Sequence, residues 1–214
     1  MSQHPALSIV RDHVVTPVVR ESDTERARRV VAALREGGFR VFEITMSVPG
    51  AIDLIAETAQ HAGLTVGVGT VLDHDDARRA VAAGATFVVS PAFIPAVLEA
   101  AHAAGAAAIL GAATPTEVHS AWSAGADAVK VFPAASFGGP SHLRALKSVF
   151  PDVPLIPTGD VDLTNLAEYL AAGAHSVGVG GALCKTTIDA LPDLARRYLA
   201  AAGAKAAPSG KDRS

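Results

Sequence analysis

Lys130 is the residue whose surroundings in the sequence point most directly to chemistry. It lies inside the apolar run AVKVF, residues 128–132, and the alternation of strand side chains places Val129 and Val131 on one face. Ala128, Lys130 and Phe132 share the other face. The valines suit the face that helices cover, so we expect Lys130 to point inward. Burying an ammonium group costs several kcal/mol and favours the neutral amine, which is the form that attacks a ketone. The alternative is a lysine that extends to solvent from the strand end.

Glu43 occupies a similar position, between apolar neighbours in VFEIT, residues 41–45. We expect its carboxyl group to point to the same interior as Lys130. There it can keep the ammonium charge paired, or it can move protons during dehydration and carbon–carbon bond cleavage. The two roles do not exclude each other, and the position in the sequence does not separate them.

Two threonines and three glycines could hold the rest of a substrate. Thr70, in VGVGTVL, and Thr158, in IPTGDV, follow runs that end in small residues. Their hydroxyls and nearby backbone N–H groups could hold a carboxylate, or each could instead cap the helix that follows. Gly159 and the pair Gly180–Gly181 resemble the loops after the seventh and eighth strands in which many barrel enzymes bind phosphate.

A metal centre is not expected. The eight histidines show neither a His-x-His nor a His-Glu-x-x-His spacing. The acidic run from Asp73 to Asp76, with His74 inside it, looks at first like a set of ligands. Its place at the start of a predicted helix indicates capping instead.

A repeating pattern of strands and helices must position these residues. Six glycines precede strand-like runs at spacings of 25, 21, 21, 20 and 48 residues, the last about two periods: Gly38, Gly63, Gly84, Gly105, Gly125 and Gly173. Glycine there supplies the left-handed turn between a helix and the next strand. Runs rich in β-branched residues predict strands at 13–19, 40–45, 65–69, 86–90, 107–111, 126–132, 153–157 and 175–179.

Helices are predicted between these strands, with start signals at Asp23, Asp75 and Asp162. Eight β–α units predict an α/β protein, a single-domain (β/α)8 TIM barrel that spans residues 1–202. A doubly wound open sheet is the alternative, although no Gly-x-Gly-x-x-Gly motif follows the first strand. A leucine-rich solenoid is excluded because no Leu/Asn consensus recurs. We expect residues 203–214, which are small and polar, to form a disordered tail.

Polar and special residues gather where the predicted strands end. They are Arg20, Glu43, Thr45, Thr70, Ser90, Pro91, Lys130, Phe132, Thr158, Gly180 and Gly181. In TIM barrels the active site lies at the carboxyl ends of the strands. We therefore expect these residues to surround one site.

Composition limits the possible partners and the compartment. The net charge is −3 and no basic stripe is present, so no nucleic-acid partner is expected. No apolar stretch reaches about 20 residues without a charge or a helix breaker, and Arg11 and Asp12 precede any long apolar run. We therefore expect neither a membrane span nor a secretory signal. The single cysteine, Cys184, cannot form an internal disulfide and suits a reducing cytoplasm.

Several segments together resemble one known family. In order, they are FEIT, VGVGTVL, ATFVVSPAF, TPTEVHSAWSAGADAVKVFPA and IPTGDV. They are similar to segments of the 2-keto-3-deoxy-6-phosphogluconate and 4-hydroxy-2-oxoglutarate aldolases, and the similarity extends from about Val14 to Leu199. The resemblance implies a class I aldolase that is a homotrimer and uses no metal or other cofactor. It also implies a small 2-keto acid substrate that yields pyruvate and an aldehyde.

The resemblance implies roles for individual residues. Lys130, in KVFPA, corresponds to the Schiff-base lysine, and Glu43, in FEIT, to the general acid and base. Substrate contacts are implied for Thr70 at the carboxylate, for Pro91 and Phe132 as walls of the pocket, and for Thr158 beside the ketoacid.

Three positions depart from the family pattern. Ser47 stands where the gluconate-type members have Arg and the galactonate-type members have Asn. Arg20, which aligns with an Arg of the galactonate type, could bind the carboxylate instead. Asp160 replaces the second Gly of a Thr-Gly-Gly turn, where its charge would repel a phosphate, although it could accept hydrogen bonds from sugar hydroxyls. Ala182 replaces a polar residue after the strand-eight glycines. We therefore expect less dependence on a terminal phosphate.

Two other functions remain open at this point. A barrel isomerase or epimerase that acts on a sugar phosphate would use Glu43 as a base without covalent chemistry, and it would keep its activity when Lys130 becomes Arg. A catalytically silent barrel, used as a binding module, would have no need for a lysine inside an apolar strand. Such a module would also bind no ketoacid.

Overall fold

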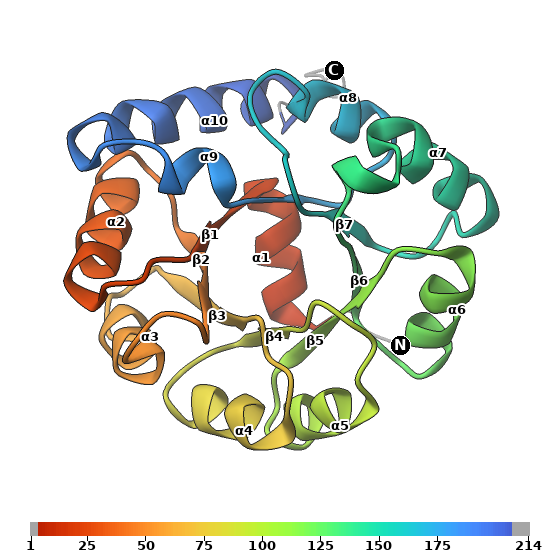
Figure 1. Cartoon of the computed structure of the whole chain (residues 1–214), viewed down its shortest axis with the longest axis horizontal. Coiled ribbons are helices and arrows are strands. Elements are labelled where there is room, and N and C mark those ends of the chain that lie inside the picture. The colour runs from red at the N-terminus through yellow and green to blue at the C-terminus, as the bar shows by residue number, and fades with distance from the viewer. Residues whose placement is uncertain (1–3, 207–214) are drawn as a thin grey trace, which may run out of the picture.

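The computed structural model describes residues 4–206 and consists of parallel strands that alternate with helices (Figure 1). The strands are β1 (Val15–Val19), β2 (Val41–Thr45), β3 (Thr65–Gly69), β4 (Phe87–Val89), β5 (Ala107–Ala112), β6 (Ala128–Val131), β7 (Leu155–Pro157) and β8 (Val177–Val179). Their order is β7-β6-β5-β4-β3-β2-β1-β8, and a bridge between Thr158 and Gly178 joins the two ends of the sheet. The predicted TIM barrel is confirmed, and the doubly wound alternative is wrong.

Helices cover the outside of the barrel. They are α1 (Pro5–His13), α2 (Thr24–Glu36), α3 (Ala51–Ala59), α4 (His74–Ala82), α5 (Pro95–Ala103), α6 (Pro115–Ser123), α7 (Gly139–Val149), α8 (Leu166–Ala171), α9 (Gly181–Cys184) and α10 (Leu191–Ala206), with 3₁₀ turns at Ala135–Phe137 and Ile188–Ala190. All six glycines of the predicted repeat adopt a positive φ, between 79° and 110°. Asp23 caps α2 as predicted, because its carboxylate accepts the Arg26 N–H at 2.7 Å.

Two of the predicted helix starts are wrong. Helix α4 is capped by Asp73, whose carboxylate accepts the Asp76 N–H at 2.8 Å, so Asp75 lies in the first turn. The acidic run therefore caps a helix, although two residues earlier than its pattern indicated. Asp162 does not begin α8. Its carboxylate accepts hydrogen bonds from Thr164, and the helix starts only at Leu166.

Helix α1, which the sequence analysis did not predict, lies within the ring of strands in the view of Figure 1. Its side chains join the apolar interior of the barrel in one cluster: Ala6, Leu7, Val10, Val41, Phe87, Val89, Ala107, Ile109, Ala128 and Ile156. Since Val41, Ala107 and Ala128 are the first residues of their strands, α1 covers the amino-terminal end of the barrel. Its cap is His4, whose ring accepts the Ala6 N–H, and histidine is not a usual cap residue.

A second apolar layer separates the strands from the outer helices. It contains Val129 and Val131, which confirms the predicted alternation along β6. Helix α10 continues to Ala206, so residues 203–206 are helical, whereas residues 207–214 of the predicted tail lie outside the described residues. Within residues 4–206, no helix is both long and apolar enough to cross a membrane.

Candidate active site

A buried ion pair between Lys130 and Glu43 lies inside the barrel. Lys130 comes from β6 and Glu43 from β2. Lys130 Nζ lies 3.4 Å from Glu43 Oε1, and each residue is only 4% exposed. The amine also lies 5.5 Å from the centroid of the Phe132 ring. The inward orientation of Lys130 is confirmed, and the alternative in which it reaches solvent is wrong.

Glycines on the neighbouring strands leave room for these two long side chains. A Cβ atom at Gly69 would come within 2.0 Å of Glu43 Oε1. Gly111 pairs with Lys130 in the sheet, and a Cβ atom there would come within 2.1 Å of the Pro91 backbone. Gly69 therefore leaves room for the Glu43 side chain, and Gly111 allows the loop after β4 to approach β5 closely beside Lys130.

Arg20 extends from the end of β1 and joins three of the predicted residues at the mouth of the barrel. Its guanidinium donates a hydrogen bond to Thr70 Oγ1 at 2.8 Å and another to Ser47 Oγ at 3.3 Å. Ser47 Oγ in turn lies 2.8 Å from Thr45 Oγ1. Within residues 4–206 no carboxylate lies within ion-pair distance of Arg20. The exposed guanidinium is therefore available to an anion that enters the mouth.

Thr70 holds an unusual backbone conformation beside Arg20. Its φ is 59°, which is strained for a β-branched residue and costs about 1–3 kcal/mol. Such strain gathers at functional sites. The alternative role as a helix cap is wrong for both threonines, because α4 is capped by Asp73 and Asn165 occupies the N-cap position of α8.

The loops after β7 and β8 contain the residues that were predicted for a phosphate. Gly159 has a φ of 106°, and Asp160, which is exposed, has a φ of 53°. The backbone carbonyl of Asp160 accepts a hydrogen bond from the Asn165 side chain at 2.9 Å. Gly180 precedes the short helix α9, which starts at Gly181. These loops belong to the same carboxyl end of the barrel as Lys130 and Arg20.

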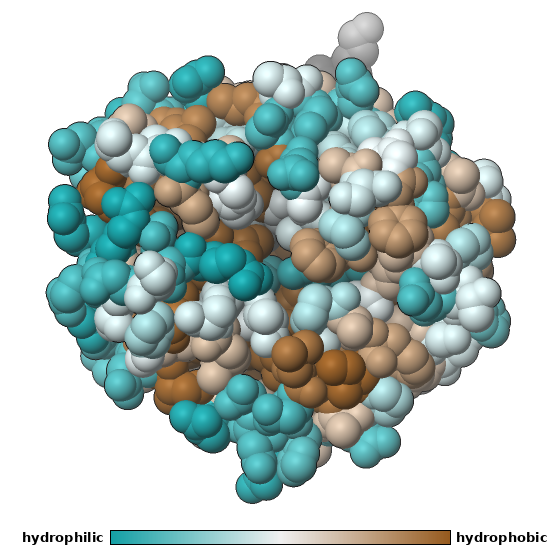
Figure 2. All heavy atoms as spheres, viewed as in Figure 1, coloured by the Kyte–Doolittle hydropathy of each residue, from teal (hydrophilic) through white to brown (hydrophobic). Residues whose placement is uncertain are grey.

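Pro91 and Phe132, which were predicted to wall the pocket, follow β4 and β6. Phe132 is 37% exposed, a large fraction for an aromatic ring that lies next to a buried amine. Figure 2, viewed along the barrel, shows a hollow near the centre of the molecule, bordered by both hydrophilic and hydrophobic side chains. An exposed ring next to the buried amine offers an apolar contact to a bound molecule.

A small cavity lies inside the barrel against the ion pair. Its polar lining consists of Thr16, Glu43, Lys130 and Thr158, and its apolar lining includes Val10 of α1. Thr16 was not among the site residues predicted from the sequence. The sequence does place its hydroxyl at an inward position of β1, two residues before Val18. Thr16 lies away from the carboxyl end of the strand, however, where active-site residues were expected.

Two other nucleophilic groups are less suited to covalent chemistry. Burial lowers the pKa of Lys147, but this lysine lies on α7, and its ammonium donates hydrogen bonds to the carbonyls of Pro151 and Val153. Burial raises the pKa of the Cys184 thiol, so the thiol remains protonated and weakly nucleophilic at neutral pH. Within residues 4–206 no group of three or more His, Cys, Asp or Glu side chains could hold a metal ion.

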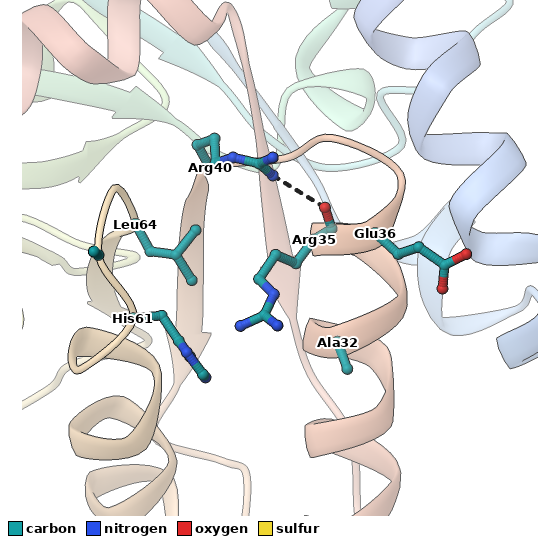
Figure 3. Close-up of a pocket in the computed structure, with 7 residues that line it drawn as sticks. Ala32, Arg35, Glu36, Arg40, His61 and Leu64 are labelled. Carbon is teal, nitrogen blue, oxygen red and sulfur yellow. Dashed lines mark hydrogen bonds between the residues drawn. The ribbon is translucent and has the colours of Figure 1, made fainter.

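A more open recess lies at the other end of the molecule, between α2 and α3 (Figure 3). Arg40 and Leu64, which line it, immediately precede β2 and β3, so the recess belongs to the amino-terminal end. Figure 3 shows Arg35 and His61 extending into the space between the two helices, while Glu36 points away. All three side chains are exposed, and none contacts Lys130 or Glu43. This recess is therefore separate from the candidate site.

Comparisons with known proteins place the chain in a family. A family model described as KDPG and KHG aldolase matches residues 7–197. A 2-dehydro-3-deoxy-phosphogluconate aldolase of Treponema pallidum is 41% identical over 158 residues, which is 73% of this chain and 75% of that protein. A probable 2-dehydro-3-deoxy-6-phosphogalactonate aldolase of Rhizobium meliloti is 38% identical over 187 residues, 86% of this chain and 87% of that protein.

One solved structure connects the fold to covalent chemistry. It is the KDPG aldolase of Legionella pneumophila, described with pyruvate captured at low pH as a covalent carbinolamine intermediate. The two sequences are 30% identical, and the alignment covers 89% of this chain and 96% of the Legionella chain, with a TM-score of 0.78. Because the family model matches residues 7–197, which is most of this chain, the chain belongs to the KDPG and KHG aldolase family.

Proposed function

We propose that this chain cleaves a 2-keto-3-deoxy sugar acid, with or without a phosphate, or 4-hydroxy-2-oxoglutarate into pyruvate and an aldehyde. Its family makes the chain a class I pyruvate aldolase, which is an aldehyde-lyase. The observation that carries the proposal is the buried pair of Lys130 and Glu43, with 3.4 Å between Nζ and Oε1. An amine and a proton carrier are the two groups that Schiff-base chemistry needs, and the reaction requires no metal or other cofactor.

In the proposed mechanism Lys130 is the nucleophile and Glu43 moves the protons. Transfer of a proton from the ammonium to Glu43 leaves a neutral amine, which attacks the C2 carbonyl and forms a carbinolamine. Glu43 then protonates the carbinolamine hydroxyl, water departs, and the nitrogen lone pair forms the iminium. The carboxylate of Glu43 removes the C4 hydroxyl proton, directly or through a water, and the electrons of the C3–C4 bond move into the iminium as the aldehyde leaves. Protonation of the enamine at C3 and hydrolysis release pyruvate.

Arg20 is the proposed partner of the pyruvyl carboxylate, together with Thr70 and Ser47. A guanidinium that already bonds both hydroxyls is oriented in advance for a planar anion. Ser47 is too short to replace an arginine, but it supports the Arg20 head group. Pro91 and Phe132 would contact the carbon chain of the substrate, and Thr158 would lie beside the ketoacid.

The substrate is proposed to depend little on a terminal phosphate. Gly159, Gly180 and Gly181 would leave room for the distal end of the substrate, but Asp160 places an exposed carboxylate in the same loop region. Two like charges about 4 Å apart repel by about 1 kcal/mol in water and by more where water is excluded. Asp160 could instead accept hydrogen bonds from the hydroxyls of an unphosphorylated sugar acid.

Turnover of matched phosphorylated and unphosphorylated 2-keto-3-deoxy acids tests this preference. We expect the two values of kcat/KM to differ by less than about 10-fold. Asp160→Gly should shift their ratio toward the phosphorylated form by about 10-fold, because it removes one unfavourable charge interaction. A preference above about 100-fold for the phosphorylated substrate in the unchanged enzyme would contradict the proposal.

Borohydride trapping with pyruvate tests the covalent mechanism. Reduction of the iminium should leave a pyruvyl adduct on the peptide that contains Lys130, identified by intact and peptide mass spectrometry. Lys147→Arg is the matched control, because burial lowers the pKa of Lys147, and the adduct on Lys130 should remain in this variant. A folded, soluble enzyme without an adduct on Lys130 would remove this mechanism and favour an isomerase or a silent binding barrel.

We also propose that the chain acts in the cytoplasm as a homotrimer whose main partner is its small 2-keto acid substrate. The family resemblance supports the trimer, and the single cysteine and the net charge of −3 support a reducing compartment and no nucleic-acid partner. Sedimentation of the full chain measures its assembly. A monomer across the micromolar range would contradict the trimer.

A further inference from the structure

Thr16 is a buried hydroxyl that the mechanism above does not use. It lies in the middle of β1 and is only 4% exposed. Its Oγ1 atom has no hydrogen-bond partner among the described residues, although a buried hydroxyl without a partner is costly. Thr16 lines the same cavity as Lys130 and Glu43. The unpaired hydroxyl therefore faces the two groups that are proposed to carry the reaction.

The size and lining of this cavity suit a single water molecule. Its accessible volume is about 10 Å³, close to the space that one water needs. Four polar side chains surround it, namely Thr16, Glu43, Lys130 and Thr158, and a buried water commonly makes two to four hydrogen bonds. The remaining lining is apolar, so a water there would be fixed by these four groups.

Gly178 keeps both threonine hydroxyls open to the cavity. It pairs with Thr16 in the sheet on one side and bridges to Thr158 on the other. A Cβ atom at Gly178 would come within 2.3 Å of Thr158 Oγ1. Because Gly178 has no side chain, the space between the hydroxyls of Thr16 and Thr158 stays open. Both threonines line the cavity that Lys130 and Glu43 also line.

We propose that Thr16 is a positioning residue that holds the water exchanged when the carbinolamine and the iminium interconvert. This inference rests on the proposed covalent role of Lys130. In dehydration, Glu43 donates its proton to the carbinolamine hydroxyl, the C2–O bond breaks, the nitrogen lone pair forms the C=N bond, and the water released binds to Thr16 Oγ1. In hydrolysis the oxygen of this water attacks C2, its proton goes to Glu43, and the C=N electrons return to nitrogen.

Two exchange reactions of pyruvate separate this role from a merely structural one. The C2 oxygen exchanges with H₂¹⁸O only when the iminium is hydrated, whereas C3 hydrogens exchange with D₂O whenever the iminium and the enamine interconvert. A slower hydration step lengthens the life of the iminium and raises the number of C3 exchanges for each oxygen exchange. Both rates are measured by mass spectrometry, with the buffer-only exchange subtracted.

Thr16→Val keeps the shape of the side chain and removes the hydroxyl. We expect oxygen exchange to fall about 10-fold, the size of one hydrogen bond lost in the transition state, and the ratio of C3 to oxygen exchange to rise by a similar factor. Thr16→Ser, which retains the hydroxyl, should keep the ratio of the unchanged enzyme. Ser176→Ala is the matched control, because Ser176 is also fully buried and also unpaired, yet it does not line the cavity. Its ratio should not change.

The outcomes distinguish this inference from the proposed function. An unchanged ratio in Thr16→Val, or an equal fall of both exchange rates, would overturn the role of Thr16 as a holder of water. Absence of any enzyme-dependent exchange in the unchanged protein, with no borohydride adduct, would overturn the Lys130 mechanism itself. If Thr16→Val does not fold, the Thr16→Ser and Thr16→Ala pair gives the same comparison at lower steric risk, with the ratio expected to rise only in the alanine variant.

Discussion

The two ends of the barrel are built on opposite principles. At the carboxyl end, a buried ion pair, an exposed arginine and two residues with positive φ, Thr70 and Asp160, gather around one mouth. At the amino end, helix α1 covers the strands with Ala6, Leu7 and Val10 in a purely apolar cluster. Buried charge and backbone strain each cost free energy, and both occur where substrate is proposed to bind.

Burial of the apolar cluster at the amino end stabilises the fold, which offsets the free-energy cost of the buried charges and the backbone strain at the carboxyl end. Substitutions at the two ends should affect different measurements: at the carboxyl end they should lower activity with little effect on folding, and at the amino end they should lower stability with little effect on catalysis. A substitution that violates this division would show that the ends are coupled.

Lys130→Arg should have the largest effect. Arginine keeps a positive charge beside Glu43 but has no neutral form at ordinary pH, so it cannot attack a ketone. We expect kcat/KM to fall by at least about 10³-fold, with the folded state retained by circular dichroism. Lys185→Arg, at an exposed position after α9, is the control and should keep full activity. Substantial activity in Lys130→Arg would instead favour non-covalent base chemistry by Glu43.

Glu43→Gln should have the next largest effect. The amide has the size of the carboxyl group but carries no proton between the substrate and the amine. We expect kcat to fall by about 10²- to 10³-fold with a smaller change in KM, and trapping of pyruvate to continue at a reduced rate. Glu99→Gln, on an exposed face of α5, removes a carboxylate without these contacts and should leave kcat unchanged. A normal kcat in Glu43→Gln would mean that this residue serves only as an ion-pair partner.

The two arginines at opposite ends give a matched comparison. Arg20→Ala removes a guanidinium proposed to bind the carboxylate, so KM should rise about 10- to 100-fold, the range of one charge-assisted hydrogen bond. Arg35→Ala removes a guanidinium from the recess in Figure 3 and should change KM by less than about twofold. Steady-state kinetics with a 2-keto acid decide the matter. A larger rise in KM for Arg35→Ala than for Arg20→Ala would indicate that the substrate binds at the amino-terminal end of the barrel instead.

Local patterns in the sequence predicted the strands and the inward face of β6. Each strand is a short run with a period of two, so the positions of Val129, Val131 and Lys130 follow from alternation alone. The turns at the six repeated glycines are equally local, since a positive φ is a property of the residue. The grouping of Lys130 with Glu43 needed one further rule, that a closed parallel barrel gathers the carboxyl ends of its strands.

What the sequence did not reveal depends on distant contacts. Helix α1 is stabilised by contacts with strands that lie far along the chain, which a local pattern does not show. Its cap, His4, also carries no strong local signal. The role of Thr16 arises only because Gly178 and Lys130 approach it from strands far along the chain. The start of α8 was misplaced because Asp162 forms a local turn with Thr164, which competes with the helix.

Leu7→Ala should have the smallest effect on activity and tests the amino end. Leu7 is fully buried between α1 and the strands, and its truncation removes apolar contacts and leaves a cavity. We expect a loss of about 2–5 kcal/mol of unfolding free energy, with kcat/KM of the folded enzyme within about twofold. Ile9→Ala, on the same helix but 38% exposed, should lose less than about 1 kcal/mol. Thermal and denaturant unfolding measure both variants. If Leu7→Ala lowered kcat with little loss of stability, α1 would be part of the catalytic machinery, and the division between the two ends would be wrong.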